Sequence, residues 1–108
     1  MKRFAANRVC WVSAHELKRN QVVELDNLSH EVLRTFSLQE EVCHTEWIGG
    51  IILLAETCPQ KMERECFAAF LKRVEASCSE LGILHAYHIT AFDVNSMEFT
   101  TKSRIVLL

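Results

Sequence analysis

The fold is decided by residues 47–54, whose sequence is Trp-Ile-Gly-Gly-Ile-Ile-Leu-Leu. A short apolar run of this kind is typical of a buried strand. The pair Gly49-Gly50 inside the run predicts a bulge or the close approach of another backbone. The residues that follow, Ala55 to Pro59, leave the strand and lead into a predicted helix. The other predicted elements lie before this strand or after the predicted helix.

Three further strands are predicted before this one. Phe4–Val12 is rich in apolar and β-branched residues, and Gln21–Leu25 and Glu31–Ser37 have a similar character. Between the last two, residues 26–30 supply turn chemistry, because Asp and Asn tolerate the left-handed conformation and bond to their own backbone. These two strands therefore form a predicted hairpin. Two polar segments in this half are expected to form a turn and a loop, namely residues 15–20 and residues 38–45.

A long amphipathic helix is predicted over about residues 58–81. Thr57 and Gln60 fit a capping box, and Pro59 is tolerated in the first turn because its missing N–H would be unpaired there anyway. Gly82 is expected to end the helix. At ~100° per residue the apolar side chains gather within an arc of about 140°. The members of this arc are Met62, Cys66, Phe67, Phe70, Leu71, Val74, Cys78 and Leu81.

After Gly82 the pattern returns to extended chain. Residues 83–94 carry apolar residues, residues 93–96 are turn-like, and residues 103–108 form a predicted terminal strand. One apolar helical face and one sheet predict a two-layer α+β domain. We therefore expect a single domain over residues 1–108, in which one long helix packs on a small, mostly antiparallel, sandwich-like sheet. A chain of this length can bury one modest core.

Composition argues against several classes of protein. The 12 basic and 14 acidic residues give a net charge of −2 without any basic stripe, so a nucleic-acid surface is not favoured. No segment approaches the roughly 18 apolar residues that a membrane span needs. The N-terminus has no apolar core of a signal peptide, so a cytoplasmic location and reduced thiols are expected. The cysteines are Cys10, Cys43, Cys58, Cys66 and Cys78, and the last two are expected to act as small hydrophobes on the helix.

Four segments of the chain have sequences typical of strands in one known superfamily. They are Lys2–Asn7, Leu17–Asp26, Thr45–Ile52 and Phe92–Leu108. In this order they resemble the N-terminal and C-terminal strands of the metal-dependent amidohydrolase superfamily. In that family the two ends of the chain pair in a small β-sandwich beside the catalytic barrel. The resemblance implies a solitary version of this accessory sandwich, with the predicted helix in the place of the barrel.

The resemblance stops where the catalytic site of the family begins. A TIM barrel alone needs ~250 residues, and this chain has 108. The metal motif of the family places two histidines at positions i and i+2, a spacing that does not occur among the five histidines of this chain. They are His15, His30, His44, His85 and His88. We therefore expect no catalytic residue, no metal and no cofactor.

Two histidine-containing groups are still candidate metal sites. His85 and His88 lie three apart on a predicted strand and would face opposite sides, so they could not easily share one ion. Cys43 and His44 are adjacent in an acidic loop with Glu40, Glu41 and Glu46. Adjacent Cys and His rarely chelate one ion with good tetrahedral geometry, so a solvated loop is favoured over a metal site.

Aromatic and acidic residues supply the remaining candidates. Trp11 and Trp47 could mark a binding surface, because aromatic residues are enriched in interfaces, although core packing between the strands is favoured. Glu24 and Asp26 would share a strand face. Exposed acids at a hairpin are favoured there over a general acid and base.

These observations predict a non-enzymatic structural or protein-interaction module. A small sheet with one helix leaves edges that invite association, so a homodimer or another protein partner is expected. One alternative is a small enzyme or ligand-binding protein with a pocket between helix and sheet. That pocket would be formed by His88, Tyr87 and Glu63, the last of which is expected in the first turn of the helix. Another alternative is a metal or thiol sensor that uses Cys43 and His44.

Overall fold

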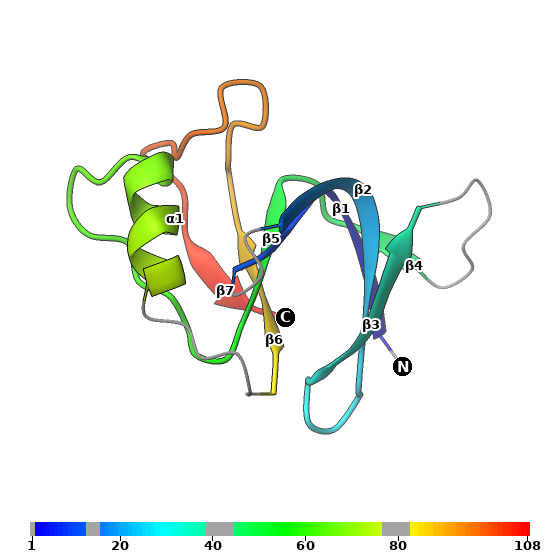
Figure 1. The fold of residues 1–108 in the computed structure, drawn as a ribbon. Coiled ribbons are helices and arrows are strands. Elements are labelled where there is room, and N and C mark those ends of the chain that lie inside the picture. Colours follow the sequence, from blue (N-terminus) through cyan, green and yellow to red (C-terminus); the bar gives the residue numbers. More distant parts are fainter. Residues whose placement is uncertain (1, 13–15, 39–44, 77–82) are drawn as a thin grey trace.

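The structure is a computed structural model that describes residues 2–12, 16–38, 45–76 and 83–108. Within these residues the chain forms seven strands and one helix (Figure 1). The strands are β1 (Lys2–Trp11), β2 (Glu16–Leu25), β3 (Val32–Ser37), β4 (Thr45–Trp47), β5 (Ile51–Ala55), β6 (His85–Ile89) and β7 (Ile105–Leu107), and the helix is α1 (Phe67–Ala76). The α+β class predicted from the sequence is confirmed.

The strands belong to one curled sheet. Their order is β3-β2-β1-β5-β6-β7, and β4 pairs with β1 next to β5. β1 runs parallel to β4 and β5 while the other four pairs are antiparallel, so the sheet is mixed and most of its pairs are antiparallel, as predicted. The Val32 N–H donates to the Leu84 carbonyl at 2.8 Å, and Glu31 and His85 form a bridge, so β3 approaches β6 at one end. Figure 1 shows the two halves of the sheet facing each other, which makes one sheet sandwich-like.

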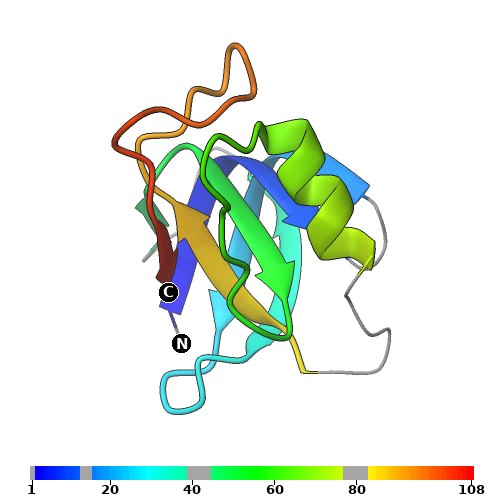
Figure 2. The same ribbon diagram turned by 90° about the vertical axis from the view of Figure 1, so that its left-hand side faces the viewer.

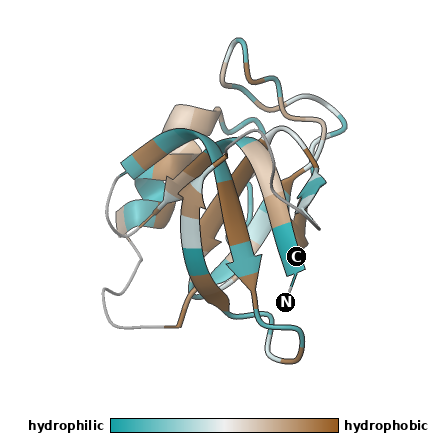
Figure 3. Ribbon diagram, turned by 90° about the vertical axis from the view of Figure 1, so that its right-hand side faces the viewer, coloured by the Kyte–Doolittle hydropathy of each residue, from teal (hydrophilic) through white to brown (hydrophobic). Residues whose placement is uncertain are grey.

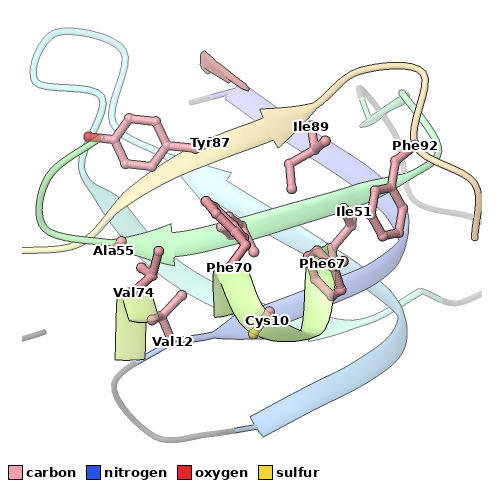
Figure 4. Close-up of a cluster of buried hydrophobic side chains, with 11 residues drawn as sticks. Cys10, Val12, Ile51, Ala55, Phe67, Phe70, Val74, Tyr87, Ile89 and Phe92 are labelled. Carbon is pink, nitrogen blue, oxygen red and sulfur yellow. The ribbon is translucent and has the colours of Figure 1, made fainter. Parts of the chain in front are cut away.

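β5 is buried on both faces, which explains its unbroken apolar sequence. Ile51 and Leu53 point toward α1, and Ile52 and Leu54 point into the curl of the sheet. The helix-side core, shown in Figure 4, consists of Cys10, Val12, Ile51, Leu53, Ala55, Phe67, Phe70, Val74, Tyr87, Ile89 and Phe92. The inner core consists of Ala6, Val9, Val23, Leu25, Ile52, Leu54 and Ala86. Figure 3 shows apolar residues running along the strands that carry these cores.

The bulge predicted at the glycine pair is confirmed. Trp47 pairs with Ala5 and Ile51 pairs with Arg8, so four steps along one strand match three steps along β1. Gly49 and Gly50 have φ angles of 66° and 63°, in the left-handed region. The Asn7 side-chain oxygen accepts a hydrogen bond from the Gly50 N–H at 2.9 Å and so occupies the backbone donor that the bulge would leave unpaired. One apolar run is thereby divided into β4 and β5.

The prediction of one helix over residues 58–81 is wrong in its first part. α1 begins at Phe67, and the preceding segment contains Arg64 with a φ of 61°, a conformation that a right-handed helix cannot include. The capping signal at Thr57 is overridden by a carboxylate from a distant loop. Glu98 accepts the Phe67 N–H at 2.6 Å and the Phe99 N–H at 3.1 Å, which fixes the helix start.

The residues of the predicted apolar arc have different fates. Phe67, Phe70 and Val74 are buried as predicted. Leu71 is partly buried against the helix-side core. Met62 and Cys66 are exposed, and Glu63 lies outside the helix, because the segment before Phe67 is not helical. Three further predicted positions lie outside the described residues: Cys78, Leu81 and Gly82.

The N-terminal hairpin differs from the prediction at its start. β2 begins at Glu16, so residues 16–20 are extended rather than a turn. They pair with the second half of β1, and this pairing keeps polar residues in the strand against their local preference. The turn at residues 26–30 is confirmed, since the Asp26 carboxylate accepts the N–H groups of Leu28 and Ser29 at 2.8 and 3.0 Å.

Arg73 ties the irregular segment back onto α1. Its guanidinium makes two hydrogen bonds of 2.9 Å to the Glu65 carboxylate and donates to the Gln60 carbonyl. Glu65 also accepts the Met62 N–H at 3.1 Å. These contacts, the Arg73 guanidinium first, lower the pKa of Glu65 from 4.5 to about 2. The ionised carboxylate therefore stabilises the folded segment.

This ion pair predicts a pH-dependent contribution to stability. A lowered pKa in the folded state gives a stabilisation that is present above pH 4.5 and is lost as the pH falls toward 2. We expect Glu65→Gln to be less stable than the wild type near neutral pH, and the difference to shrink over this acidic range. Urea unfolding at a series of pH values measures it. In an Arg73→Gln background the same substitution should have a smaller effect, and an equal effect would contradict the assignment to Arg73.

Candidate functional site

β7 is an edge strand whose outer side has no partner strand among the described residues. Figure 2 shows it at the left-hand edge of the sheet. The Thr90 N–H donates to the Arg104 carbonyl at 2.8 Å, and the Leu108 N–H donates to the Ala86 carbonyl at 3.0 Å. Because antiparallel pairs alternate, the backbone groups of Ile105 and Leu107 point away from β6. This leaves an open edge for pairing.

The open edge carries exposed apolar side chains. Val106 is 45% exposed and Leu107 is 52% exposed. They lie on opposite faces of β7, because successive strand residues alternate. Ile105 is only partly exposed and packs against the helix-side core. The edge therefore combines free backbone groups with apolar surface on both sides, a combination that favours association.

A pocket lies beside the start of β7, on its helix side. It has a volume of about 390 Å³, within the range of small-molecule sites. One wall is formed by the segment after β5, which passes from β5 toward α1. The other wall is formed by the segment that leads into β7. The lining residues are Cys58, Pro59, Gln60, Lys61, Phe99, Ser103, Arg104 and Ile105.

The lining of this pocket has two cationic side chains and no carboxylate. Lys61 Nζ lies 5.3 Å from the centre of the Phe99 ring and donates to the Met62 carbonyl at 3.2 Å. The Arg104 side chain is exposed, and its guanidinium has no hydrogen-bond or ion-pair partner in the part of the chain that the structure describes. The Glu98 carboxylate next to Phe99 is engaged at the start of α1. The pocket is therefore locally positive in a chain of net charge −2.

The candidate pair His85 and His88 does not form a joint site, as expected from its spacing on a strand. Tyr87 and Ile89 belong to the helix-side core and Ala86 belongs to the inner core, so alternation along β6 puts the two histidines on opposite faces. Burial lowers the pKa of His88, and its hydrogen bond with the Gly49 backbone acts in the other direction. Within the described residues, no group of three or more Cys, His, Asp or Glu side chains could hold a metal ion.

The two tryptophans have different surroundings. Trp11 packs partly buried against the inner core, and Lys18 Nζ lies 5.2 Å from its ring centre. Trp47 is 52% exposed on β4, so the expected core packing is not found there. The short β4 ends at the bulge, which leaves the indole at the surface beside Gly49. Cys43 and His44, with Glu40 and Glu41, lie outside the described residues.

Glu24 and Asp26 have structural contacts rather than an acid–base arrangement. Glu24 is 3% exposed and accepts one hydrogen bond from Arg3 of β1 at 2.9 Å and two from Arg34 of β3 at 3.2 and 3.3 Å. These guanidinium groups, that of Arg3 first, hold the pKa of the Glu24 carboxyl below its usual value. The expectation of an exposed acid is wrong for Glu24, because the hairpin lies inside a three-stranded part of the sheet. Asp26 belongs to the turn.

The pocket considered from the sequence, with Tyr87, His88 and Glu63, is not formed. Tyr87 is 6% exposed in the helix-side core, and its burial raises its pKa. Glu63 is exposed in the segment before α1. The pocket beside β7 instead combines residues about 40 positions apart in the chain. No spacing rule links such residues, so Lys61, Phe99 and Arg104 could not be predicted as one site from the sequence.

The described cysteines are not grouped. Cys10 is buried in the helix-side core, while Cys58 and Cys66 are exposed. The expected hydrophobic role therefore applies to Cys10 rather than to Cys66. Cys58 is the cysteine that lines the pocket.

Comparison of the chain with protein-family models, curated proteins and solved structures gave no match. In the part of the chain that the structure describes, no helix has the length and apolar character needed to cross a bilayer. The β7 edge and the pocket beside it are the surface features of the described residues that bear on function.

Proposed function

We propose that this chain is a non-enzymatic interaction module that forms a homodimer through the open edge of β7. The observation that carries the proposal is the free backbone edge at Ile105 and Leu107, flanked by exposed apolar side chains. A second copy satisfies this edge without any other partner, since an antiparallel strand pair is compatible with two-fold symmetry.

The geometry of such a pair is simple. With the two-fold axis at Val106, Ile105 of one copy lies opposite Leu107 of the other. Each of these residues points its N–H and C=O outward, so both pairs can exchange two hydrogen bonds. Arg104 lies away from the two-fold axis, so Arg104 of one copy is not opposite Arg104 of the other, and like charges do not meet. β3, at the other end of the strand order, has its Arg34 side chain bound to Glu24.

The resemblance to the amidohydrolase accessory sandwich agrees with this proposal. Strands from the first half of the chain and strands from its last quarter share one sheet. In our proposal α1 covers the face that a barrel would cover, and the β7 edge is the surface left for association. The module would therefore act by binding and assembly rather than by catalysis.

Leu107→Pro tests the proposal. Proline removes the N–H that points outward from the edge and restricts the φ angle at this position. The pairing of β7 with β6 should be kept, because its hydrogen bonds use Arg104, Val106 and Leu108. We expect the wild type to sediment as a dimer of the 12.4 kDa chain at micromolar concentration and Leu107→Pro to sediment as a monomer. A short edge gives a small interface, so the dimer should dissociate on dilution.

Leu107→Ala is the matched control, because it shortens the same side chain and keeps the N–H. It should remain dimeric, with weaker association than the wild type. Circular dichroism should show that all three proteins are folded. A monomeric wild type, or a Leu107→Pro protein that dimerises as well as the wild type, would exclude the β7 edge as the dimer interface.

A further inference from the structure

The pocket beside β7 combines cationic side chains with apolar ones. Its cationic side chains come from two segments that meet only in the folded chain, Lys61 after β5 and Arg104 before β7. None of its lining residues is acidic. We propose that this pocket binds a small organic carboxylate, with Arg104 and Lys61 at the carboxylate and Phe99 and Ile105 at the apolar part.

Arg104 is positioned by its backbone rather than by its side chain. The Arg104 N–H donates to Thr90 Oγ1 at 3.1 Å, and the Arg104 carbonyl accepts the Thr90 N–H at 2.8 Å. These two bonds hold the residue in the lining of the pocket and leave the guanidinium available. A guanidinium presents parallel N–H donors that match the two oxygens of a carboxylate. The fixed backbone therefore offers a donor group without an internal acceptor.

Lys61 supplies the second positive charge. Its ammonium lies over the face of Phe99, and it has three donors, of which one is used by the Met62 carbonyl. The ring contact limits where the side chain can go, and it keeps the charge at the wall of the pocket. A bound anion would accept from the remaining donors. Two cations on opposite walls then select for negative charge.

The floor of the pocket is apolar, which selects for more than a bare ion. The Phe99 ring is held by contacts with Phe67, Phe70 and Phe92, at ring-centre distances of 5.6, 5.2 and 5.9 Å. Ile105 packs against the same core. The Ser103 hydroxyl is occupied, since it donates to the Ala91 carbonyl at 3.1 Å and accepts the Thr100 N–H at 2.9 Å. Both the charge and the apolar part of the carboxylate should therefore contribute to its binding.

Benzoate is a suitable probe, since it joins a carboxylate to an apolar ring of a size that fits the pocket. We expect saturable, millimolar binding in an NMR titration at constant ionic strength, with amide shifts at Cys58, Gln60 and Lys61 and at residues 103–105. Benzamide, which has the same shape without the charge, should not bind. Inorganic phosphate should bind much more weakly than benzoate, and equal binding of phosphate would overturn the role of the apolar floor.

Arg104→Gln should weaken benzoate binding about tenfold, the effect of losing a charge-assisted hydrogen bond. Arg19→Gln is the matched control, because Arg19 is an exposed arginine of β2 that does not line the pocket. It should bind benzoate like the wild type. Lys61→Gln provides an independent test on the other wall and should also weaken binding. No saturable binding, or equal affinity of the wild type and both pocket variants, would overturn the proposal.

Discussion

Phe70→Ala should lower the free energy of unfolding by about 3–5 kcal/mol, the usual cost of removing a buried aromatic ring. Phe70 is fully buried at 0% exposure, and its ring centre lies 6.2 Å from that of Phe67 and 5.2 Å from that of Phe99. Figure 4 shows its side chain pointing from α1 toward the sheet. Small domains are stable by only about 5–15 kcal/mol, so this one substitution would remove a large share. Urea unfolding followed by circular dichroism measures the loss.

Lys72→Ala is the control on the same helix. Lys72 is exposed, and alanine favours helix, so its effect should stay within about 0.5 kcal/mol. The comparison separates loss of helix from loss of packing. If Phe70→Ala cost less than about 1 kcal/mol, α1 would not be what closes this face of the sheet, and the helix-side core would have to be stable without it.

The parts of the fold that were predictable have local causes. β5 could be predicted because burial on both faces requires a continuous apolar run, and the bulge because the adjacent Gly49 and Gly50 are free to adopt positive φ. The turn at Asp26 followed from a side chain that bonds its own backbone. Each of these signals acts within a few residues. The tertiary contacts of the fold do not override these local preferences.

The start of the helix could not be predicted, because its determinant is distant in the chain. Thr57, Pro59 and Gln60 make a reasonable local start, yet the first helical N–H that is capped belongs to Phe67 and its acceptor is Glu98. The acceptor comes from a loop 31 residues away. A local capping rule cannot contain that contact. The same limit applied to β2, whose polar first residues are extended because β1 pairs with them.

The candidate sites depended even more on distant contacts. His85 and His88 could be rejected as a pair from strand alternation alone, and the structure places them on opposite faces. Trp47 is at the surface because the bulge shortens β4, which no residue count reveals. The pocket is formed by two segments that have no sequence pattern in common. The sequence could therefore exclude His85 and His88 as a joint site, but only the fold shows which residues line the pocket together.

Gly50→Ala should lower the free energy of unfolding by about 2–3 kcal/mol. A side chain in the left-handed region costs about 1–2 kcal/mol, and Gly50 has a φ of 63°. A Cβ at this position would also lie 3.3 Å from the Ile89 carbonyl oxygen and 3.4 Å from His88 Nε2, which is tight against a backbone that cannot easily move. Chemical denaturation measures the loss.

Gly49→Ala isolates the first of these two contributions, the cost of the left-handed conformation. Gly49 has a similar φ of 66°, but a Cβ there would meet only the Asn7 side-chain oxygen at 3.5 Å and Trp47 Nε1 at 3.7 Å, both ordinary contacts. It should therefore cost about 1 kcal/mol, the conformational part alone. A larger loss at Gly50 means that the bulge brings β6 against the glycine backbone, and so sets the register on which the inner core depends. Equal losses at the two positions would mean that the glycines serve only the turn of the chain.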